Sequence, residues 1–256
     1  MREQHYFEIH NAELRHWWFC ARRQIVASLI AKFASTRRPL RIADIGRGTG
    51  ASFAMLARFG WTVGIDCSQL ALAFSRTRGH LQLAAAALPS LPFQANSFDI
   101  VCAMDVIEHI EDDAGAVREL LRICKPEGLI VLTVPAYQWL WSIHDDINEH
   151  KRRYTRPQVQ ALLRSLPVTV ERISYMNTLL APPVMVYRQI RRLSRRFVDQ
   201  SQATESDDFV LPTPVNWALY KFFAAESSWL TYHSLPFGTS VICIARKYPN
   251  GYALES

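Results

Sequence analysis

The sequence has few cysteines, and their spacing does not favour a disulfide or metal framework. Cys20, Cys67, Cys102, Cys124 and Cys243 are scattered, odd in number and never arranged as CxxC, which indicates reduced thiols in a cytoplasmic protein. No apolar run approaches the ~20 residues of a membrane span. The opening residues lack the apolar segment of a signal peptide. We therefore expect a cytoplasmic globular protein without a disulfide framework.

The sequence also lacks a strong excess of charge of one sign. It carries 29 basic against 23 acidic residues, a formal net charge of +6. This mild excess excludes a histone-like protein and permits an anionic partner without requiring one. With 256 residues, 49% of them hydrophobic, the chain can bury a core of one large domain or two small ones.

Short continuous apolar runs alternate with amphipathic segments along the first two thirds of the chain. We expect strands at 40–45, 61–65, 81–84, 98–104 and 129–134, and helices at 12–34, 51–59, 69–78 and 112–124. Apolar strands separated by helices are typical of a parallel sheet covered on both faces. Further on we expect a helix at 155–166, strands at 168–175 and 239–246, and an insertion at 177–237 without a strand pattern.

A glycine-rich turn follows the first expected strand. Gly46, Gly48 and Gly50 permit a tight turn and a close approach of the backbone to a ligand. Asp66 ends the second expected strand, 22 residues after Asp44, where a carboxylate can accept hydrogen bonds from both hydroxyls of a ribose. These residues predict a ligand with an adenosine-like ribose. A dinucleotide, since the glycines also fit GxGxx(G/A), and a corner without a ligand stay open as alternatives.

Four further segments follow in a fixed order. They are LPFQANSFD at 91–99, EH at 108–109, KPEG at 125–128 and TVP at 133–135. Together with the glycine turn, the series closely resembles class I S-adenosylmethionine-dependent methyltransferases of the type 11/12 group, over about residues 38–175 and again in the final strand. The resemblance implies an α/β, Rossmann-like, doubly wound seven-stranded sheet, mostly parallel with an antiparallel last strand. It also implies an enzyme that transfers a methyl group from S-adenosylmethionine.

The resemblance also suggests how a single methyltransferase domain over 1–256 is organised. We expect an N-terminal helical lid at 1–37, a cofactor-binding core at 38–176, a helical insertion or substrate cap at 177–237 and a final strand at 238–247. The segment HWWFCARR at 16–23 resembles the opening of a bacterial subgroup of these enzymes. Trp17 or Trp18 would cover the cofactor, or would only pack in the core.

The resemblance implies a set of cofactor-binding residues. The glycines would line the methionine part, Asp66 would bind the ribose, and the full set is Asp44, Gly46, Gly48, Gly50, Asp66, Cys67, Leu88, Met104 and Asp105. The sequence departs from the family at Arg47, where many relatives carry a small residue, and at 84–87, where an Asp often contacts the adenine amine. We expect Arg47 to reach the cofactor carboxylate or to point to solvent, and backbone groups to contact the adenine.

Methyl transfer to a hydroxyl requires alignment of the acceptor and removal of a proton. Candidate bases should follow the fourth and fifth strands, since ligands lie at the carboxyl ends of an open α/β sheet. His144 beside Asp145 is the first candidate for the general base and His150 the second, with a scaffold role for His150 as the alternative. The predicted acceptor-binding residues are Trp139, Trp141, Arg152, Arg153 and Tyr154, of which the arginines would hold a phosphate or carboxylate.

A possible metal element lies at 105–109. Asp105, Glu108 and His109 form an acid-x-x-Glu-His pattern similar to one that binds a divalent metal in some ubiquinone-pathway O-methyltransferases. Carried over by position, these three residues would be the ligands. In the alternative that we prefer, His109 caps a helix and packs near the cofactor, so we expect no metal.

The segment 178–197 joins an apolar half to a half with five arginines and no acid. Such a basic amphipathic helix can lie on an anionic membrane surface or cover the site, and a solvated helix face is the alternative. We find no motif for nucleic-acid binding. We therefore expect an O-methyltransferase with a histidine base, acting on a small-molecule or lipid-linked, anionic acceptor, with peripheral contact at the inner membrane face. An NAD(P)-dependent oxidoreductase and a non-catalytic cofactor-binding relative stay as alternatives.

Overall fold

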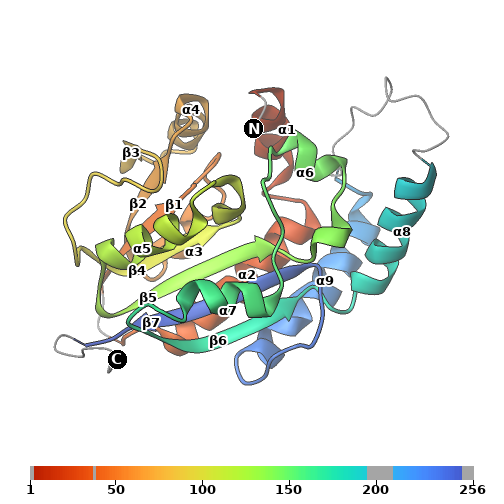
Figure 1. Ribbon diagram of the computed structural model, residues 1–256. Helices are drawn as coiled ribbons and strands as arrows, with labels where there is room; N and C mark the ends of the chain where they lie inside the picture. Colours follow the sequence, from red (N-terminus) through yellow and green to blue (C-terminus); the bar gives the residue numbers. More distant parts are fainter. Residues whose placement is uncertain (1–2, 37–38, 195–209, 250–256) are drawn as a thin grey trace.

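The computed structural model describes residues 3–36, 39–194 and 210–249, which form a seven-stranded sheet between two layers of helices (Figure 1). The strand order is β3-β2-β1-β4-β5-β7-β6. The strands are β1 (Leu40–Ile45), β2 (Gly60–Asp66), β3 (Leu83–Ala85), β4 (Phe98–Met104), β5 (Cys124–Pro135), β6 (Val168–Met176) and β7 (Ser240–Lys247). Strands β1 to β5 pair in parallel, whereas β7 runs antiparallel to both β5 and β6. The predicted Rossmann-like class and the antiparallel last strand are confirmed.

The helices are α1 (Glu3–Ala12), α2 (Trp17–Phe33), α3 (Phe53–Ala57), α4 (Gln69–Thr77), α5 (Asp113–Ile123), α6 (Ile143–Ile147), α7 (Arg156–Leu163), α8 (Ala181–Ser194) and α9 (Thr213–Leu230). Short 3-10 turns, η1 (Ile107–His109) and η2 (Gln138–Leu140), follow β4 and β5. Helices α5 and α7 cover one face of the sheet, where Leu120 and Val159 join its core. Helices α2 and α9 cover the other face through Ile25 and Phe223. Residues from both ends of the chain therefore support the same face.

The register of the parallel strands brings their carboxyl ends to one edge of the sheet. Ile45 of β1 lies opposite Ile65 of β2 and Ala103 of β4, and Met104 lies opposite Thr133 of β5. The loops that follow these strands therefore meet at the same place, which is where ligands bind in open α/β sheets.

The expected helix over 12–34 is wrong at its start. Helix α1 ends at Ala12, the chain turns, and α2 begins at Trp17. His16 closes the start of α2, because its ring nitrogen accepts a hydrogen bond from the backbone N–H of Trp18 at 3.4 Å. Leu14, which belongs to the expected apolar stripe, is exposed in this turn.

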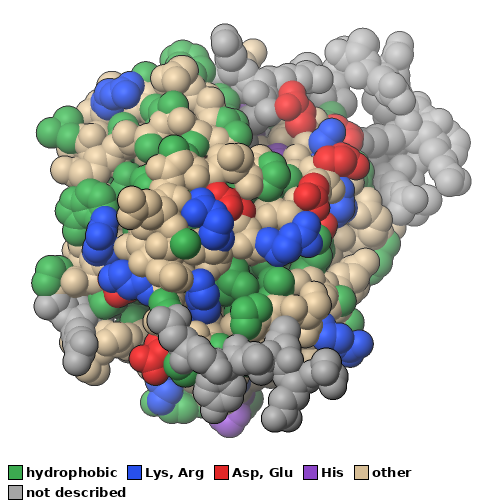
Figure 2. Space-filling model, turned by 60° about the vertical axis from the view of Figure 1, so that its left-hand side comes forward, with side chains coloured by type: hydrophobic (Ala, Val, Ile, Leu, Met, Phe, Trp, Pro, Cys, Tyr) green, Lys and Arg blue, Asp and Glu red, His purple; other side chains and the backbone are tan. Residues whose placement is uncertain are grey.

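Two features of the molecular surface bear on the expected partners. No helix among the described residues is both long and apolar enough to cross a membrane. On the face shown in Figure 2, lysine and arginine side chains are interspersed with acidic and apolar ones. On that face the positive charge therefore does not gather into one basic patch of the kind that binds nucleic acid.

Candidate cofactor and acceptor site

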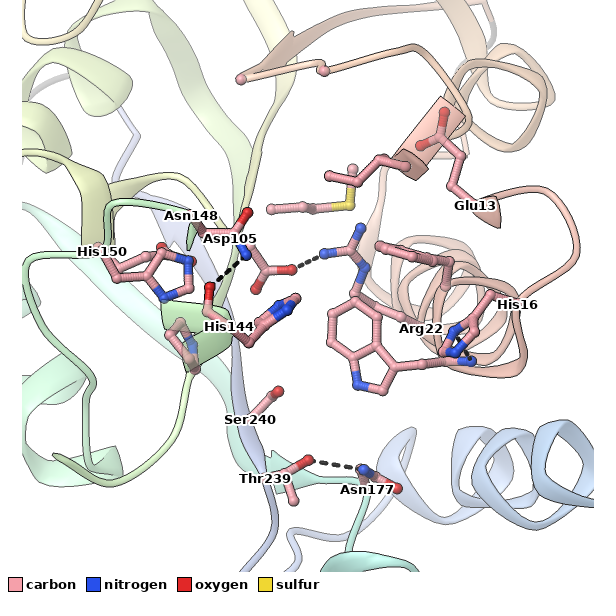
Figure 3. A pocket seen from close by; sticks show the side chains of 18 of the residues that line it. Glu13, His16, Arg22, Asp105, His144, Asn148, His150, Asn177, Thr239 and Ser240 are labelled. Atoms are coloured by element: carbon pink, nitrogen blue, oxygen red, sulfur yellow. Dashed lines mark hydrogen bonds and ion pairs between the residues drawn. The ribbon is translucent and has the colours of Figure 1, made fainter. Parts of the chain in front are cut away.

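A cavity of about 420 Å³ lies at the carboxyl edge of the sheet (Figure 3). One end is lined by the loop after β1, with Gly46 and Gly48, and by Met104 at the end of β4. The other end is lined by the segment after β5, including His144 and His150. Helices α1, α2, α8 and α9 and the start of β7 complete its walls. The size is that of a pocket for a small molecule or cofactor.

The glycine turn is held in a form that requires glycine. Gly46 and Gly48 have φ values of 63° and 58°, which L side chains rarely adopt. A Cβ on Gly46 would lie 2.4 Å from Cγ2 of Val106. Asp66 supports the turn because one carboxylate oxygen accepts a hydrogen bond from the N–H of Gly48 at 2.7 Å. The glycine-turn residues and the acid after β2 are therefore next to one another, as predicted.

Asp66 does not itself line the cavity, because helix α1 lies between them. Its second carboxylate oxygen accepts from the N–H of Ser68 at 2.9 Å, and burial raises the pKa of the carboxyl. Tyr6 of α1 lines the cavity and interacts with Ser68, beside Asp66. Helix α1 packs on α4 through an edge-to-face contact of Phe7 with Phe74, whose ring centroids are 4.9 Å apart. Helix α1 therefore closes the end of the cavity that leads to Asp66.

Helix α2 is fixed over the cavity by two buried charges. Glu13, in the turn before α2, accepts hydrogen bonds from Thr49 of the glycine turn and from Arg78. Arg22 of α2 forms an ion pair with Asp105, as Figure 3 shows, and lies over the ring of Trp18 at 4.7 Å. Burial lowers the pKa of Arg22 to about 10, so the guanidinium stays charged at neutral pH. Trp17 and Trp18 both line the cavity, so the helix contributes to its wall.

Arg47 does not point to solvent. It is buried against Gly64, and its guanidinium donates to Nδ1 of His80 at 2.5 Å and lies 4.9 Å from the ring centre of Phe53. Its charge also lies 3.5 Å from Asp44, whose pKa burial raises to about 6. Arg47 and Asp44 therefore form a buried support beneath the glycine turn, and the expectation that Arg47 points to solvent is wrong. Arg47 also lines the cavity, so its contact with a cofactor carboxylate stays a prediction.

The acid beside His144 does not orient that histidine. Both oxygens of Asp145 accept from Arg153, at 2.7 and 2.9 Å, and one also lies 2.8 Å from Nδ1 of His150. The N–H of Ser142 donates to the same carboxylate at 2.7 Å. These contacts hold the pKa of Asp145 well below its usual range, although burial opposes them. Among the two candidate bases, His150 is therefore the histidine that Asp145 fixes, and the role of His144 as the base stays a prediction.

His144 lies in the cavity wall in an environment that keeps the imidazole neutral. Burial lowers its pKa to about 3, and the positive charge of Arg188 acts in the same direction. Arg188 comes from α8, lines the cavity, and donates to the carbonyl of Leu140 at 3.0 Å. The ring of His144 lies 6.4 Å from that of His150, centroid to centroid. Three histidines, His109, His144 and His150, and two arginines, Arg153 and Arg188, therefore line this part of the cavity.

The three residues of the acid-x-x-Glu-His element do not share one environment. Asp105 is occupied by Arg22 and by the hydroxyl of Thr133, which donates to it at 3.0 Å. Glu108 and His109 line the cavity from η1. Burial raises the pKa of Glu108 to about 8 and lowers that of His109 to about 4. The carboxylate of Asp105 is therefore engaged elsewhere, and the ligand set implied by the resemblance does not fit a metal as it stands.

Several of the predicted site residues lie outside this cavity. Its lining includes Gly46, Gly48, Met104, Asp105, His144, His150 and Arg153, but not Asp44, Gly50, Asp66, Cys67, Leu88, Asp145, Trp139, Trp141, Arg152 or Tyr154. The predicted acceptor-binding side chains have other contacts. Trp141 donates to Asp146 at 2.8 Å, Trp139 stacks on Tyr137, Arg152 pairs with Asp113 at 3.2 Å, and the buried Tyr154 donates to the same Asp113. These residues support the loop after β5 rather than wall the cavity.

Several residues that line or support the cavity were not predicted from the sequence. Glu226 of α9 accepts hydrogen bonds from the backbone N–H groups of Asn177 and Thr178, at 2.7 and 2.6 Å, and so fixes the turn between β6 and α8. Asn177 in turn donates to Thr239 at 2.8 Å, and both line the cavity (Figure 3). Arg22 belongs to the segment HWWFCARR, whose resemblance to relatives could have identified it. No sequence pattern predicts the roles of Glu13, Glu226 or Asn177, because their hydrogen-bond partners are distant in the chain.

The sequence of this chain is similar to a known family and to several known proteins. Residues 43–132 match the family described as "Methyltransferase domain". A probable S-adenosylmethionine-dependent methyltransferase of Mycobacterium tuberculosis is 33% identical over 129 residues, 50% of this chain and 46% of that protein. A ubiquinone biosynthesis O-methyltransferase of Thiobacillus denitrificans is 27% identical over 175 residues, 61% of this chain and 69% of that protein. The chain thus spans about half the length of the mycobacterial relative.

The fold is also found in solved structures. A chain in the complex between the Haloferax volcanii Trm112 methyltransferase activator and a methyltransferase superposes with a TM-score of 0.61 at 16% identity, covering 98% of this chain and 96% of that chain. At this identity the likeness concerns the fold alone.

Proposed function

We propose that this chain, whose core is that of a class I S-adenosylmethionine-dependent methyltransferase, transfers the methyl group of S-adenosylmethionine to an oxygen of a small-molecule or lipid-linked acceptor that carries negative charge. One observation carries the proposal. A single cavity joins Gly46 and Gly48, at the donor end, to His144 at the other end. A methyl donor and a proton acceptor can therefore face the same space.

The donor end of the proposed mechanism uses the residues around the glycine turn. Gly46 and Gly48 would admit the methionine part of the cofactor close to the backbone, and Asp66 would accept hydrogen bonds from the ribose hydroxyls. Cys67 and Leu88 would lie beside the adenine. Since Tyr6 interacts with Ser68 next to Asp66, the ribose requires α1 to shift from its present position.

The acceptor end provides a neutral base. The imidazole of His144 is uncharged at physiological pH because burial and Arg188 lower its pKa to about 3. An anionic group of the acceptor beside Arg188 would offset that arginine's charge and raise the basicity of His144. In-line attack by the acceptor oxygen on the sulfonium methyl would then transfer the hydroxyl proton to His144 and release S-adenosylhomocysteine.

Transfer to oxygen also has support from a relative. The Thiobacillus denitrificans relative is named an O-methyltransferase of ubiquinone biosynthesis, and it is aligned with 61% of this chain. The cavity itself presents two arginines and three histidines at the proposed acceptor end, which suit an oxygen acceptor with negative charge.

Helices α8 and α9 offer a route for a lipid-linked acceptor. Val184 and Arg188 of α8 and Leu219 of α9 line the cavity, while Trp217 and Trp229 of α9 expose more than half of their surface. Exposed tryptophans beside basic residues are typical of segments that lie in a membrane interface. We propose peripheral contact through this surface and through 178–197, of which 195–197 lie outside the described residues, at the inner face of the membrane.

Turnover of S-adenosylmethionine labelled on its methyl group tests the proposed function. The acceptors would be a lipid extract and an aqueous metabolite extract of the source cells, assayed separately. His144→Ala should lower turnover at least about 100-fold, the usual contribution of a general base, with unchanged affinity for the cofactor. His233→Gln, which alters a histidine of the turn after α9, serves as the matched control. Wild-type turnover in His144→Ala would remove His144 from the mechanism.

Flotation with liposomes tests the membrane contact separately. The wild type should float with vesicles rich in phosphatidylglycerol and much less with phosphatidylcholine alone. The double substitution Trp217→Ala and Trp229→Ala should reduce flotation without changing cofactor affinity. A wild type that stays at the bottom of the gradient with both vesicles would contradict the membrane proposal and leave the methyl-transfer proposal intact.

A further inference from the structure

We propose that Glu108, His109 and His150 bind a divalent transition-metal ion in the wall of the cavity. The three residues come from two separate segments, η1 and the loop after α6. One potential ligand atom from each lies within 4.8 Å of the other two, and all three residues line the cavity. The set differs from the one that the sequence resemblance implies, because His150 replaces Asp105.

The first support is the state of the Glu108 carboxylate. Glu108 is fully buried, at 0% exposure, and neither of its oxygens has a hydrogen-bond partner among the described residues. The two neighbouring acids are neutralised otherwise, Asp105 by Arg22 and Asp145 by Arg153. A buried carboxyl without a partner is costly, so a missing cationic ligand explains why this one is retained at the edge of a cavity.

The second support is the way the two histidines are oriented. Asp145 holds Nδ1 of His150 at 2.8 Å, which leaves Nε2 as the ligand atom. The backbone of Asn148 and Glu149 lies beside the ring of His109. A carboxylate or a carbonyl on the far nitrogen is the usual arrangement for a metal-binding histidine, since it fixes the tautomer and the direction of the free lone pair.

The two segments that carry the ligands are also joined to each other. The N–H of Lys151 donates to the carbonyl of Glu108 at 2.7 Å, and the rings of His109 and His150 meet edge to face with centroids 4.7 Å apart. For a tetrahedral zinc ion with bonds of about 2.0 Å, the ligand atoms must approach to about 3.3 Å. The side chains therefore need to close by at most about 1.5 Å, which rotation of Glu108 and the rings can supply.

The donor set selects the kind of metal. Two imidazoles and one carboxylate suit zinc, iron(II) and similar first-row ions, and leave one or more coordination positions open. Those positions would face the cavity, where a bound ion would polarise an acceptor oxygen. This role, unlike the binding itself, depends on the proposed function. His150 would then be a ligand, and His144 would be the histidine left to take the proton.

Metal binding is measured directly, without cofactor or acceptor. The protein is stripped with a chelator and titrated with Zn²⁺ in a calorimeter, and with Co²⁺ in a spectrophotometer. We expect one saturable ion per chain and a Co²⁺ spectrum without a thiolate charge-transfer band. Glu108→Gln should weaken Zn²⁺ binding at least about 100-fold, and Asp145→Asn about 10- to 100-fold through the loss of its hold on His150. Glu149→Gln, in the same loop but outside the ligand set, should bind as the wild type does.

The outcomes separate the metal from the methyl transfer. Absence of saturable binding by the wild type, or full binding by Glu108→Gln, would overturn the metal site. A thiolate band with Co²⁺ would place the ion on a cysteine and overturn it as well. Because Glu108→Gln keeps the shape of the side chain, it should fold, and the wild-type Co²⁺ spectrum decides the question if it does not. A protein that binds Zn²⁺ but no S-adenosylmethionine would overturn the proposed function alone.

Discussion

At the scale of single residues, Asp145 determines the arrangement of the segment after β5. Its carboxylate joins Arg153, His150 and the start of α6. His144 and Asp145 are neighbours in the sequence, but adjacent residues of a helix point in different directions. Asp145 therefore faces inward, while the chain turns after α6, with Glu149 at φ 57°, and brings His150 back to it. A helical reading of 143–147 would have predicted that His144 and Asp145 diverge, but five residues are too short to show a helical period.

Replacement of Asp145 should destabilise the protein strongly. Asp145→Asn leaves the guanidinium of Arg153, which is only 4% exposed, without its counter-charge. Removal of one partner from a buried ion pair costs about 3–5 kcal/mol. Urea unfolding should therefore give a free energy of unfolding lower by about that amount. The control Asp146→Asn, whose partner Trp141 is near the surface, should lose about 1 kcal/mol or less, and equal losses in the two variants would contradict the buried pair.

His80 makes the stability of the fold depend on pH. Burial first, and then Arg47 and Arg78, lower its pKa to about 4 in the folded protein. The unfolded histidine titrates near 6.5, so the unfolded state binds the proton first as the pH falls. The stability contributed by neutral His80 is thus complete above pH 6.5 and is lost between about pH 6.5 and pH 4.

Substitution of His80 by glutamine should remove that pH dependence. The amide oxygen of glutamine can still accept from Arg47 but does not titrate. Between pH 7.5 and pH 5, the loss in free energy of unfolding should be smaller than in the wild type by about 2 kcal/mol. Urea unfolding at both pH values measures this difference. An identical loss in the two proteins would show that the folded structure does not lower the pKa of His80.

At the scale of elements, the strands were predictable and the N-terminal helices were only partly so. Strands such as β4 and β5 are buried on both faces, and continuous apolar sequence follows from that burial. Helix α1 has no comparable signal, because it packs on α4 and over the cavity through a few residues such as Tyr6 and Phe7. The glycine turn was likewise predictable from local chemistry, whereas the part of the cavity lined by α2, α8 and the loop after β5 depends on contacts between segments distant in the chain.

Helix α1 should be held in place chiefly by Glu13. In Glu13→Gln, the contacts to Thr49 and Arg78 lose the negative charge that strengthens them. Amide hydrogen exchange in residues 3–12 should therefore become about 10-fold faster or more, while exchange in β4 and β5 stays unchanged. Hydrogen exchange followed by mass spectrometry measures both regions. The exposed Glu111→Gln serves as the control, and unchanged exchange in α1 of Glu13→Gln would show that another contact anchors the helix.

At the scale of the whole molecule, the site depends on both ends of the chain. Asn216 of α9 accepts from the N–H of Trp17 at 3.0 Å and donates to the carbonyl of Arg15 at 2.8 Å. These bonds align the start of α2 with α9, and both helices line the cavity. Residues 43–132, which match the methyltransferase-domain family, line part of the cavity, and segments outside them line the rest. The net charge of the whole chain gave no information about the site, but several arginines, Arg22, Arg47, Arg153 and Arg188, line the cavity.

Calorimetric titration with S-adenosylmethionine tests the central claim most directly. The account predicts binding of one molecule per chain with micromolar affinity, similar binding of S-adenosylhomocysteine and no binding of NADH. Asp66→Ala should weaken the binding of S-adenosylmethionine at least about 10-fold, since the ribose loses its acceptor. No detectable binding of S-adenosylmethionine or S-adenosylhomocysteine by the wild type at high micromolar concentration would contradict the account, and saturable binding of NADH in their place would identify a nicotinamide-binding protein.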